Sequence, residues 1–314
     1  MKSTTRFTST RATRTIVRSM STRTTRIVFV DRAPARAVGR RGTATAARMM
    51  TARANSSSSD DVVGGGDDAT VVRERDAVGC GRALATRVRA LSRAAIARRG
   101  TFSIAVAGGS LIDALAPLKT ATDVEWSKWR VFWVDERCVK WTSEDSNFGG
   151  AYRTLFADVD VPRERLHAID ETLCEENRGA AAACARAYED DLRALTPHEI
   201  EVNDDGFPVF DVLLLGFGPD GHICSLFPHH ELLKRDEGWI LPIADSPKPP
   251  PERVTFSLPV VNAAREKIFV AMGSGKAEMT AKILKDAPRD GSVPAALVKG
   301  NVRWIVDDAA AALL

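Results

Sequence analysis

The stretch from residue 210 to residue 222 reads Phe-Asp-Val-Leu-Leu-Leu-Gly-Phe-Gly-Pro-Asp-Gly-His. Residues 210–215 are a short, almost continuous apolar run, which is typical of a strand that is buried on both faces. The run ends in a glycine-rich loop that presents Asp220 and His222. Open parallel sheets bind their ligands in loops of this kind, beyond the carboxyl ends of the strands.

The same pattern recurs on both sides of this stretch. Residues 101–107 predict a buried strand that ends in Gly108-Gly109-Ser110, and residues 129–134 predict another that ends in Asp135-Glu136-Arg137. Further strands are predicted at 69–74, 253–258, 267–272 and 302–306, and helices at 76–99, 148–156, 178–195 and 276–286. This alternation predicts an α/β protein, a three-layer α/β/α fold with a mainly parallel, Rossmann-like sheet. We expect the three polar loops to meet at one edge of that sheet.

Residues 216–221 match the pattern G-x-G-x-x-G, which is typical of dinucleotide-binding loops. Asp220 would place a carboxylate where the pyrophosphate lies, and Pro228 would cut short the helix that the motif needs. No clear strand with a terminal acid follows at the required distance of ~20 residues. The sequence therefore favours a loop that turns Asp220 and His222 toward one pocket, where the carboxylate would fix the imidazole tautomer. The alternative is a capping Asp beside a surface His.

Two other catalytic arrangements find little support. Ser225 lacks the nucleophile elbow G-x-S-x-G, so a serine triad with the neighbouring acid and imidazole is not predicted. His222, His229 and His230 could be considered as metal ligands, but a His pair in front of an acidic segment is typically solvated. We predict no metal site.

Several features suit a phosphate group. The turn at 108–110 would let backbone N–H groups approach an anion at a helix N-terminus. Lys276 stands at the start of a predicted helix, where the positive end of the helix dipole disfavours a cation. An anion bound between the lysine and the helix end would make this position favourable. Arg253 begins a strand after a proline-rich loop. Taken singly, each feature has an ordinary alternative, namely a tight turn or a solvated cation, and residues 135–137 could form a simple ion pair.

Charge is distributed unevenly along the 314 residues. Residues 1–59 hold thirteen basic residues and one acidic residue, a net charge of +12, whereas the remainder holds 31 basic and 40 acidic residues, a net charge of −9. An acidic body lacks the electrostatic support for nucleic-acid binding. No apolar run approaches the ~18 residues of a membrane span. The five cysteines form no C-x-x-C pair, which argues against a disulfide scaffold and a structural zinc module.

The N-terminal segment has the composition of an organelle-targeting signal. Residues 1–59 contain twelve Arg and twenty Ser or Thr, without the apolar core of a secretory signal. We predict a disordered transit peptide at 1–59 that engages an organellar import machinery, a linker at 60–68 and a single catalytic domain at 69–314. The hydroxyl content favours the plastid (chloroplast stroma) over the mitochondrion. The alternative is a disordered basic tail that binds an acidic partner.

The loops become far more specific when they are taken together. The chain contains, in this order, Ala107-Gly108-Gly109-Ser110, Val134-Asp135-Glu136-Arg137-Cys138-Val139, Asp145-Ser146-Asn147-Phe148, Gly216-Phe217-Gly218-Pro219-Asp220-Gly221-His222-Ile223-Cys224-Ser225-Leu226-Phe227-Pro228, Arg253-Val254-Thr255-Phe256 and Gly273-Ser274-Gly275-Lys276. Over roughly residues 70–310 the chain resembles the 6-phosphogluconolactonases of the glucosamine-6-phosphate isomerase/6-phosphogluconolactonase family. The resemblance implies a glucosamine-phosphate-isomerase-like fold without metal or cofactor. It also implies hydrolysis of 6-phospho-D-glucono-1,5-lactone to 6-phospho-D-gluconate, the second step of the oxidative pentose phosphate pathway.

The chain departs from the family pattern at Ala107, where Ser or Thr is usual, and at His229, where Gly is common. The related glucosamine-6-phosphate deaminases carry a Glu shortly after the His, where this chain has Phe227, and an aromatic residue where it has Arg137. Both differences favour the lactonase over an amino-sugar-phosphate deaminase or isomerase. The intact pair in 220–222 argues against a third alternative, a non-catalytic sugar-phosphate sensor on the same fold.

The resemblance and the chemistry of a lactone, which is an ester, together imply roles. His222 would be the general base, since its ordinary pKa of ~6.5 suits proton transfer near neutral pH, and Asp220 would orient it. Asp135 would bind sugar hydroxyls or assist proton transfer, and Arg137 or backbone N–H groups would meet the oxyanion. We expect a monomer that binds a small sugar-phosphate lactone. The residues expected to hold its phosphate are Gly108, Gly109, Ser110, Arg253 and Lys276.

Overall fold

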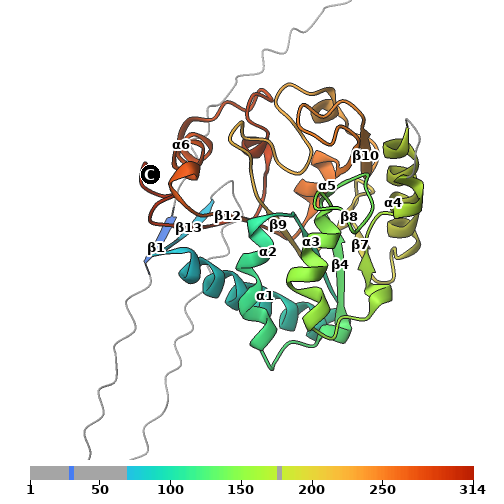
Figure 1. The fold of residues 1–314 in the computed structure, drawn as a ribbon. Coiled ribbons are helices and arrows are strands. Elements are labelled where there is room, and N and C mark those ends of the chain that lie inside the picture. Colours follow the sequence, from blue (N-terminus) through green and yellow to red (C-terminus); the bar gives the residue numbers. More distant parts are fainter. Residues whose placement is uncertain (1–27, 32–68, 175–178) are drawn as a thin grey trace, which may run out of the picture.

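The computed structural model describes residues 28–31, 69–174 and 179–314. At the centre of these residues is an eight-stranded sheet in which every neighbouring pair is parallel (Figure 1). In spatial order the strands are β1 (Val28–Asp31), β2 (Thr70–Glu74), β13 (Val302–Asp307), β12 (Glu266–Ala271), β9 (Val212–Leu215), β3 (Phe102–Val106), β4 (Trp129–Trp133) and β6 (Leu166–His167).

Helices cover both faces of this sheet. One face packs against α1 (Ala77–Arg99), α2 (Ser110–Ala114) and α3 (Asn147–Thr154), and the other against α4 (Ala180–Ala194), α5 (Leu258–Ala263) and α6 (Ala277–Ala281). Side chains of β9 alternate accordingly: Val212 and Leu214 belong to the first core, Leu213 and Leu215 to the second. All four are fully buried, which explains the unbroken apolar run. The predicted three-layer α/β/α fold is confirmed.

A second, antiparallel sheet lies beside the first. It consists of β10 (Ile240–Ile243), β11 (Arg253–Phe256) and β5 (Asp135–Arg137), and its register sets Arg253 opposite Arg137. We had expected residues 253–258 to join the largely parallel sheet. They do not, because the polar segment 135–137 takes up a strand of its own and pairs with β11. A hairpin of β7 (Glu201–Val202) and β8 (Pro208–Val209) completes the strands of the described residues.

The remaining elements agree closely with expectation. Ser146 caps α3 by accepting a hydrogen bond from the Gly149 N–H. The helix expected at 276–286 is α6, preceded by a 3-10 turn and followed by a π-helical turn. The short helical turns are η1 (Ala116–Thr120), η2 (Trp126–Lys128), η3 (Phe156–Asp158), η4 (Arg163–Arg165), η5 (Glu171–Cys174), η6 (Glu231–Lys234), η7 (Ser274–Lys276), the π-turn η8 (Lys282–Asp286) and η9 (Pro294–Leu297).

The N-terminal segment contributes one unexpected strand. Residues 28–31 form β1, which pairs in parallel with β2 at the edge of the sheet. The expectation that the whole of 1–59 is disordered does not hold at these four positions. The rest of the predicted transit peptide and the predicted linker at 60–68 lie outside the described residues.

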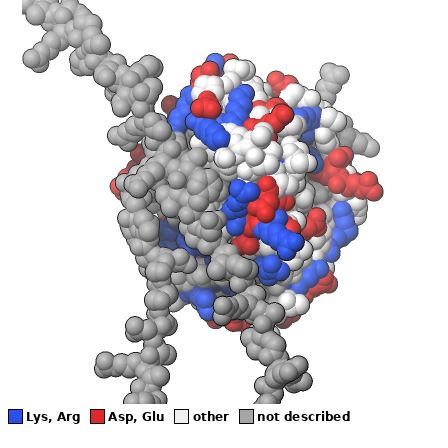
Figure 2. All heavy atoms as spheres, turned by 90° about the vertical axis from the view of Figure 1, so that its left-hand side faces the viewer, with Lys and Arg blue, Asp and Glu red and all other residues white. Residues whose placement is uncertain are grey.

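Basic and acidic side chains alternate over the visible part of the face drawn in Figure 2. That part of the surface carries no extended basic patch of the kind that nucleic-acid-binding proteins use. A search of the described helices finds none with the length and apolar character needed to cross a lipid bilayer.

Candidate functional site

A cleft opens where the chain changes direction across the parallel sheet. From β3 the chain continues to β4 on one side, and from β9 it continues to β12 on the other. The gap between β3 and β9 is therefore a topological switch point, the position at which sheets of this class bind ligands. The cleft there has a volume of about 590 Å³, within the range typical of small-molecule sites.

The cleft brings together the residues that the sequence singled out. The three polar loops expected to meet do meet there, joined by residues from β11 and η7. Asp220 is the exception, since it stands behind His222 and does not line the cleft. The predicted site residues that line the cleft are Gly108, Gly109, Ser110, Asp135, Arg137, His222, Arg253 and Lys276.

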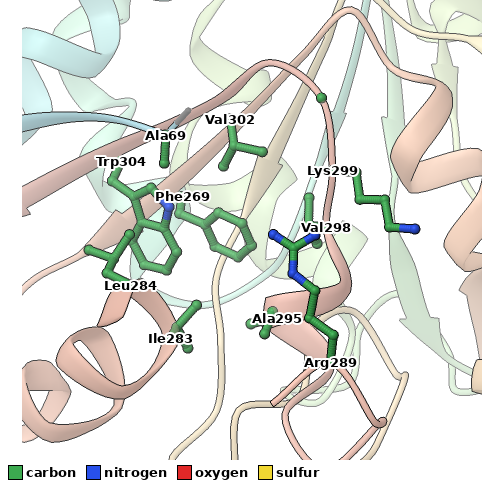
Figure 3. Close-up of a pocket in the computed structure, with 12 residues that line it drawn as sticks. Ala69, Phe269, Ile283, Leu284, Arg289, Ala295, Val298, Lys299, Val302 and Trp304 are labelled. Atoms are coloured by element: carbon green, nitrogen blue, oxygen red, sulfur yellow. The ribbon is translucent and has the colours of Figure 1, made fainter. Parts of the chain in front are cut away.

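A second cavity lies between the segment 283–300 and the strands β12 and β13 of the sheet (Figure 3). The stacked rings of Phe269 and Trp304 form one wall, and Leu284 packs against them. Arg289 and Lys299 also line it. Its volume of about 50 Å³ is far smaller than that of the cleft and lies below the range typical of small-molecule sites. The cleft is therefore the better candidate for a substrate site.

Close packing explains two glycines of the loop at 216–222, Gly218 and Gly221, without a bound nucleotide. Gly218 and Gly221 close a tight turn, in which the Gly221 N–H donates to the Gly218 carbonyl over 3.0 Å. A Cβ atom on Gly218 would lie 2.1 Å from Cε1 of His222, so only glycine lets the imidazole lie over this turn. The next helical element of the described chain is the 3-10 turn η6, not the long helix that a dinucleotide fingerprint requires.

Asp220 and His222 form the expected pair. Oδ1 of Asp220 lies 2.5 Å from Nδ1 of His222, and the His222 side chain is 18% exposed. Burial lowers the pKa of His222, the carboxylates of Asp220 and Asp135 raise it, and the cation of Lys248 lowers it further. The net result is a pKa below the ordinary histidine value, so the ring is neutral at neutral pH.

Asp135 is buried, and the side chains of Ser225 and Asn147 hold it by hydrogen bonds. Neither of these two residues was predicted as a site residue. Its Oδ2 accepts a hydrogen bond from the Ser225 hydroxyl over 2.8 Å. The Asn147 amide donates to the Asp135 carbonyl over 2.9 Å and lies 3.4 Å from Oδ1. Ser225 therefore supports a carboxylate instead of acting as a nucleophile. Asn147 stood within the family-like motif at 145–148, which was the available signal.

The alternative that residues 135–137 form a simple ion pair does not hold at Glu136, whose hydrogen-bond partners are backbone N–H groups and one hydroxyl. Its carboxylate accepts backbone hydrogen bonds from Arg137 and Asn147 at Oε1, both over 2.7 Å, and from Phe148 at Oε2 over 2.6 Å. The Ser146 hydroxyl donates to Oε2 over 3.2 Å. Burial raises the pKa of Glu136 to about 7, although these hydrogen bonds favour the charged form. Glu136 thereby ties β5 to the first turn of α3 and fixes the residues on either side of it.

Arg253 is 3% exposed, and its guanidinium group contacts both the proline-rich loop and the cleft. Its Nε donates to the Pro250 carbonyl over 2.9 Å, and its Nη2 donates to the carbonyls of Lys248 and Pro249 over 2.9 and 3.0 Å. Its Nη1 lies 3.4 Å from the Ser225 hydroxyl, on the cleft side. The guanidinium group thus fixes the proline-rich loop and presents positive charge to the cleft.

The other cations reach the cleft from different directions. Lys276 precedes α6, as predicted, and its Nζ donates to the Phe217 carbonyl over 2.5 Å. Burial lowers the pKa of Lys276, and the nearby Lys248 adds to this effect. Arg137 is oriented by a hydrogen bond of 2.8 Å from its Nη1 to the Asp145 carbonyl. Three positive groups therefore surround a space of sugar-phosphate size.

Two of the three histidines considered as metal ligands, His222 and His230, have other side-chain partners. His230 caps η6 through the Leu232 N–H, and its Nε2 lies 3.1 Å from Oδ1 of Asp245. In the part of the chain that the structure describes, no three His, Cys, Asp or Glu side chains are grouped as a metal site would need.

Comparison with known proteins places these features in a family. Residues 75–306 match the family described as glucosamine-6-phosphate isomerases/6-phosphogluconolactonase. The chain is 40% identical over 233 residues to the probable 6-phosphogluconolactonase 3, chloroplastic, of Oryza sativa subsp. indica, covering 71% of this chain and 69% of that one. It is also 40% identical to the probable 6-phosphogluconolactonase of Schizosaccharomyces pombe, covering 74% and 91%.

Solved structures agree with the sequence relatives. The structure of 6-phosphogluconolactonase from Trypanosoma brucei superposes with a TM-score of 0.69 at 28% identity, covering 79% of this chain and 100% of that one. The matched residues 75–306 include strands β3, β4, β6, β9 and β12 of the parallel sheet and the three polar loops that meet at the cleft, whereas β1 and β2 lie before them. On this evidence the chain belongs to the glucosamine-6-phosphate isomerase/6-phosphogluconolactonase family.

Proposed function

We propose that this protein hydrolyses 6-phospho-D-glucono-1,5-lactone to 6-phospho-D-gluconate, the second step of the oxidative pentose phosphate pathway. The observation that carries this proposal is an imidazole, held by the Asp220 carboxylate, that lines the same cleft as Arg253 and Lys276. The imidazole can act as a general base in hydrolysis of the ester bond, and the two cations can bind the phosphate group of the same small molecule. Relatives in plants and yeast that bear the name 6-phosphogluconolactonase support the same activity.

The phosphate group anchors the substrate. Arg253 and Lys276 supply positive charge, and the turn at 108–110 leads into α2 with backbone N–H groups available to an anion. Binding energy from this remote group positions the reacting ring, which lowers the barrier more than uniform binding would. Asp135, held by Ser225, is placed to accept hydrogen bonds from the sugar hydroxyls.

His222 activates the water. With its Nδ1 proton donated to Asp220, the ring carries its lone pair on Nε2, which takes a proton from water as the oxygen attacks the lactone carbonyl. The carbonyl oxygen becomes an oxyanion, which Arg137 or backbone N–H groups stabilise. The C–O bond to the ring oxygen then breaks, and the Nε2 proton passes to that oxygen. The products are the free hydroxyl and the carboxylic acid, which ionises in water.

A deaminase reaction on the same fold finds no support at Phe227. The resemblance described above implies that deaminases need a carboxylate shortly after the histidine to complete an acid–base relay. Phe227 is buried instead, with its ring centroid 4.7 Å from that of His222. An apolar ring desolvates the base but transfers no proton.

The proposed activity is tested with residues 69–314, freshly prepared 6-phosphogluconolactone and correction for spontaneous hydrolysis. We expect this protein to release acid faster than the uncatalysed rate, in proportion to enzyme concentration. The same lactone without its phosphate should react much more slowly, because the phosphate contacts are lost. A rate equal to spontaneous hydrolysis at every enzyme concentration would contradict the proposal.

We further propose that residues 1–59 direct the protein to the plastid. Their positive charge and hydroxyl content support import, and relatives from rice and Arabidopsis thaliana carry the description chloroplastic. A fluorescent protein fused behind residues 1–68 should accumulate in plastids. A matched fusion in which Arg11, Arg14 and Arg18 become Glu should stay outside. Mitochondrial or purely cytosolic fluorescence of the first fusion would refute plastid targeting.

A further inference from the structure

Lys248 contacts both members of the Asp220–His222 pair. It lies in the proline-rich loop between β10 and β11, far from both residues in the sequence. Its Nζ donates a hydrogen bond to Oδ1 of Asp220 over 3.2 Å and lies 3.2 Å from Nδ1 of His222. The same Oδ1 atom holds Nδ1 of His222 at 2.5 Å. An ammonium, a carboxylate and an imidazole thus meet at one oxygen.

The loop holds Lys248 firmly in this position. Its carbonyl accepts hydrogen bonds from Nη2 of Arg253 over 2.9 Å and from the Ser246 hydroxyl over 2.8 Å. The Lys248 side chain is 36% exposed, which is low for a lysine. Its contact with Asp220 is therefore anchored through the backbone by a residue of β11.

Asp220 has two opposing effects on a general base. Holding the Nδ1 proton keeps the ring oriented with Nε2 free, which helps the base. Its negative charge also stabilises the imidazolium form, which has no lone pair to accept a proton. A cation on the same carboxylate cancels the second effect and leaves the first. Among the charged groups around His222, Asp220 and Asp135 favour protonation, whereas Lys248 opposes it.

We propose that Lys248 is a positioning residue whose ammonium group neutralises Asp220, so that Asp220 orients His222 without keeping it protonated. This inference rests on the proposed lactonase activity, in which His222 is the base. Arg253 and Lys276 also contribute positive charge to the cleft, but neither contacts Oδ1 of Asp220 in the hydrogen bonds of the described residues. Of the cations in residues 69–174 and 179–314, Lys248 alone has hydrogen-bond contacts with both the carboxylate and the imidazole.

Replacing Lys248 with methionine, which keeps the aliphatic stem, removes the charge. The acid limb of the kcat/KM profile should then move up by about one pH unit or more, since a nearby charge typically shifts a pKa by that much. The rate well above that limb should stay close to the parental rate. Lys248→Arg, which keeps the charge, should leave the limb in place, and Lys248→Gln should behave like the methionine variant. A merely structural role would lower the rate equally at all pH values.

A direct titration of the His222 ring separates this inference from the proposed activity. The imidazole proton signals of residues 69–314 are followed by NMR without substrate, and His222→Gln identifies the signal among the five histidines. We expect His222 to titrate at higher pH in the Lys248→Met protein and at lower pH in Asp220→Asn. Identical titration in Lys248→Met and parent would overturn the inference. A shifted titration in a protein without lactonase activity would instead refute the proposed function alone.

Discussion

Replacing His222 with alanine should lower kcat by roughly 10²-fold or more and leave KM nearly unchanged. The imidazole acts on the water in the transition state, whereas the phosphate of the substrate is held by Arg253 and Lys276, which the substitution leaves in place. Initial rates with fresh lactone, corrected for spontaneous hydrolysis, measure both constants. Gly218, over which the ring lies, tolerates the smaller side chain, so the variant should fold normally.

The pH dependence of the parental enzyme follows from the same residue. Because burial lowers the pKa of His222, kcat/KM should fall on acidification only below the ordinary histidine range. Asp220→Asn should lower the rate less than His222→Ala and move this limb to still lower pH, since it removes a charge that favours imidazolium. The competing mechanism makes Asp135 the base. In that case Asp135→Asn would abolish turnover and His222→Gln would keep a nearly parental rate.

Replacing Arg253 with alanine should raise KM by about 10-fold to 150-fold. This range corresponds to the roughly 1.5–3 kcal/mol of a charge-assisted hydrogen bond. We also expect kcat to fall, because the carbonyls of Lys248, Pro249 and Pro250 lose the hydrogen bonds that Arg253 donates to them, and the loop beside His222 is held less firmly. Binding of a non-hydrolysed sugar phosphate, measured by calorimetry, should weaken in parallel with KM.

Lys276→Ala is the matched control for Arg253→Ala. Lys276 bonds to the Phe217 carbonyl and not to the proline-rich loop, so this variant should raise KM while kcat stays nearly constant. Arg253→Lys restores the charge without the forked geometry and should recover affinity better than kcat. Parental KM values in both alanine variants would mean that neither cation binds the phosphate.

The parallel sheet could be predicted because its signal is local. Each buried strand is an apolar run bounded by a polar loop, as in Val212–Leu215, and such runs need no partner to be recognised. The second sheet could not be predicted in this way. Its strand β5 is three polar residues long, and it exists because it pairs with β11, a segment far away in the chain. Register between distant segments leaves no periodic trace in the sequence.

The same distinction applies to the site. The contact between Asp220 and His222 was predictable because the two residues are separated by one position in an extended loop. Lys248 was missed because its loop meets theirs only in the folded protein. The role of Glu136 was not predicted, because a carboxylate among neighbouring charges is compatible with a simple ion pair, whereas its partners are backbone N–H groups of the next helix. Every residue except proline carries a backbone N–H group, so the sequence does not indicate which of them will bind Glu136.

The outermost strand of the sheet belongs to a segment that the proposed import would remove. Without β1, the backbone N–H and C=O groups along one side of β2 lose their partners, and an open strand of this kind is a template for aggregation. β2 is only five residues long, and it ends in Arg73 and Glu74, the first of which pairs with Asp308 over 2.6 Å. Short length and charge are the features that discourage strand addition by a second molecule. The precursor and the processed protein would therefore differ in which strand forms this edge of the sheet.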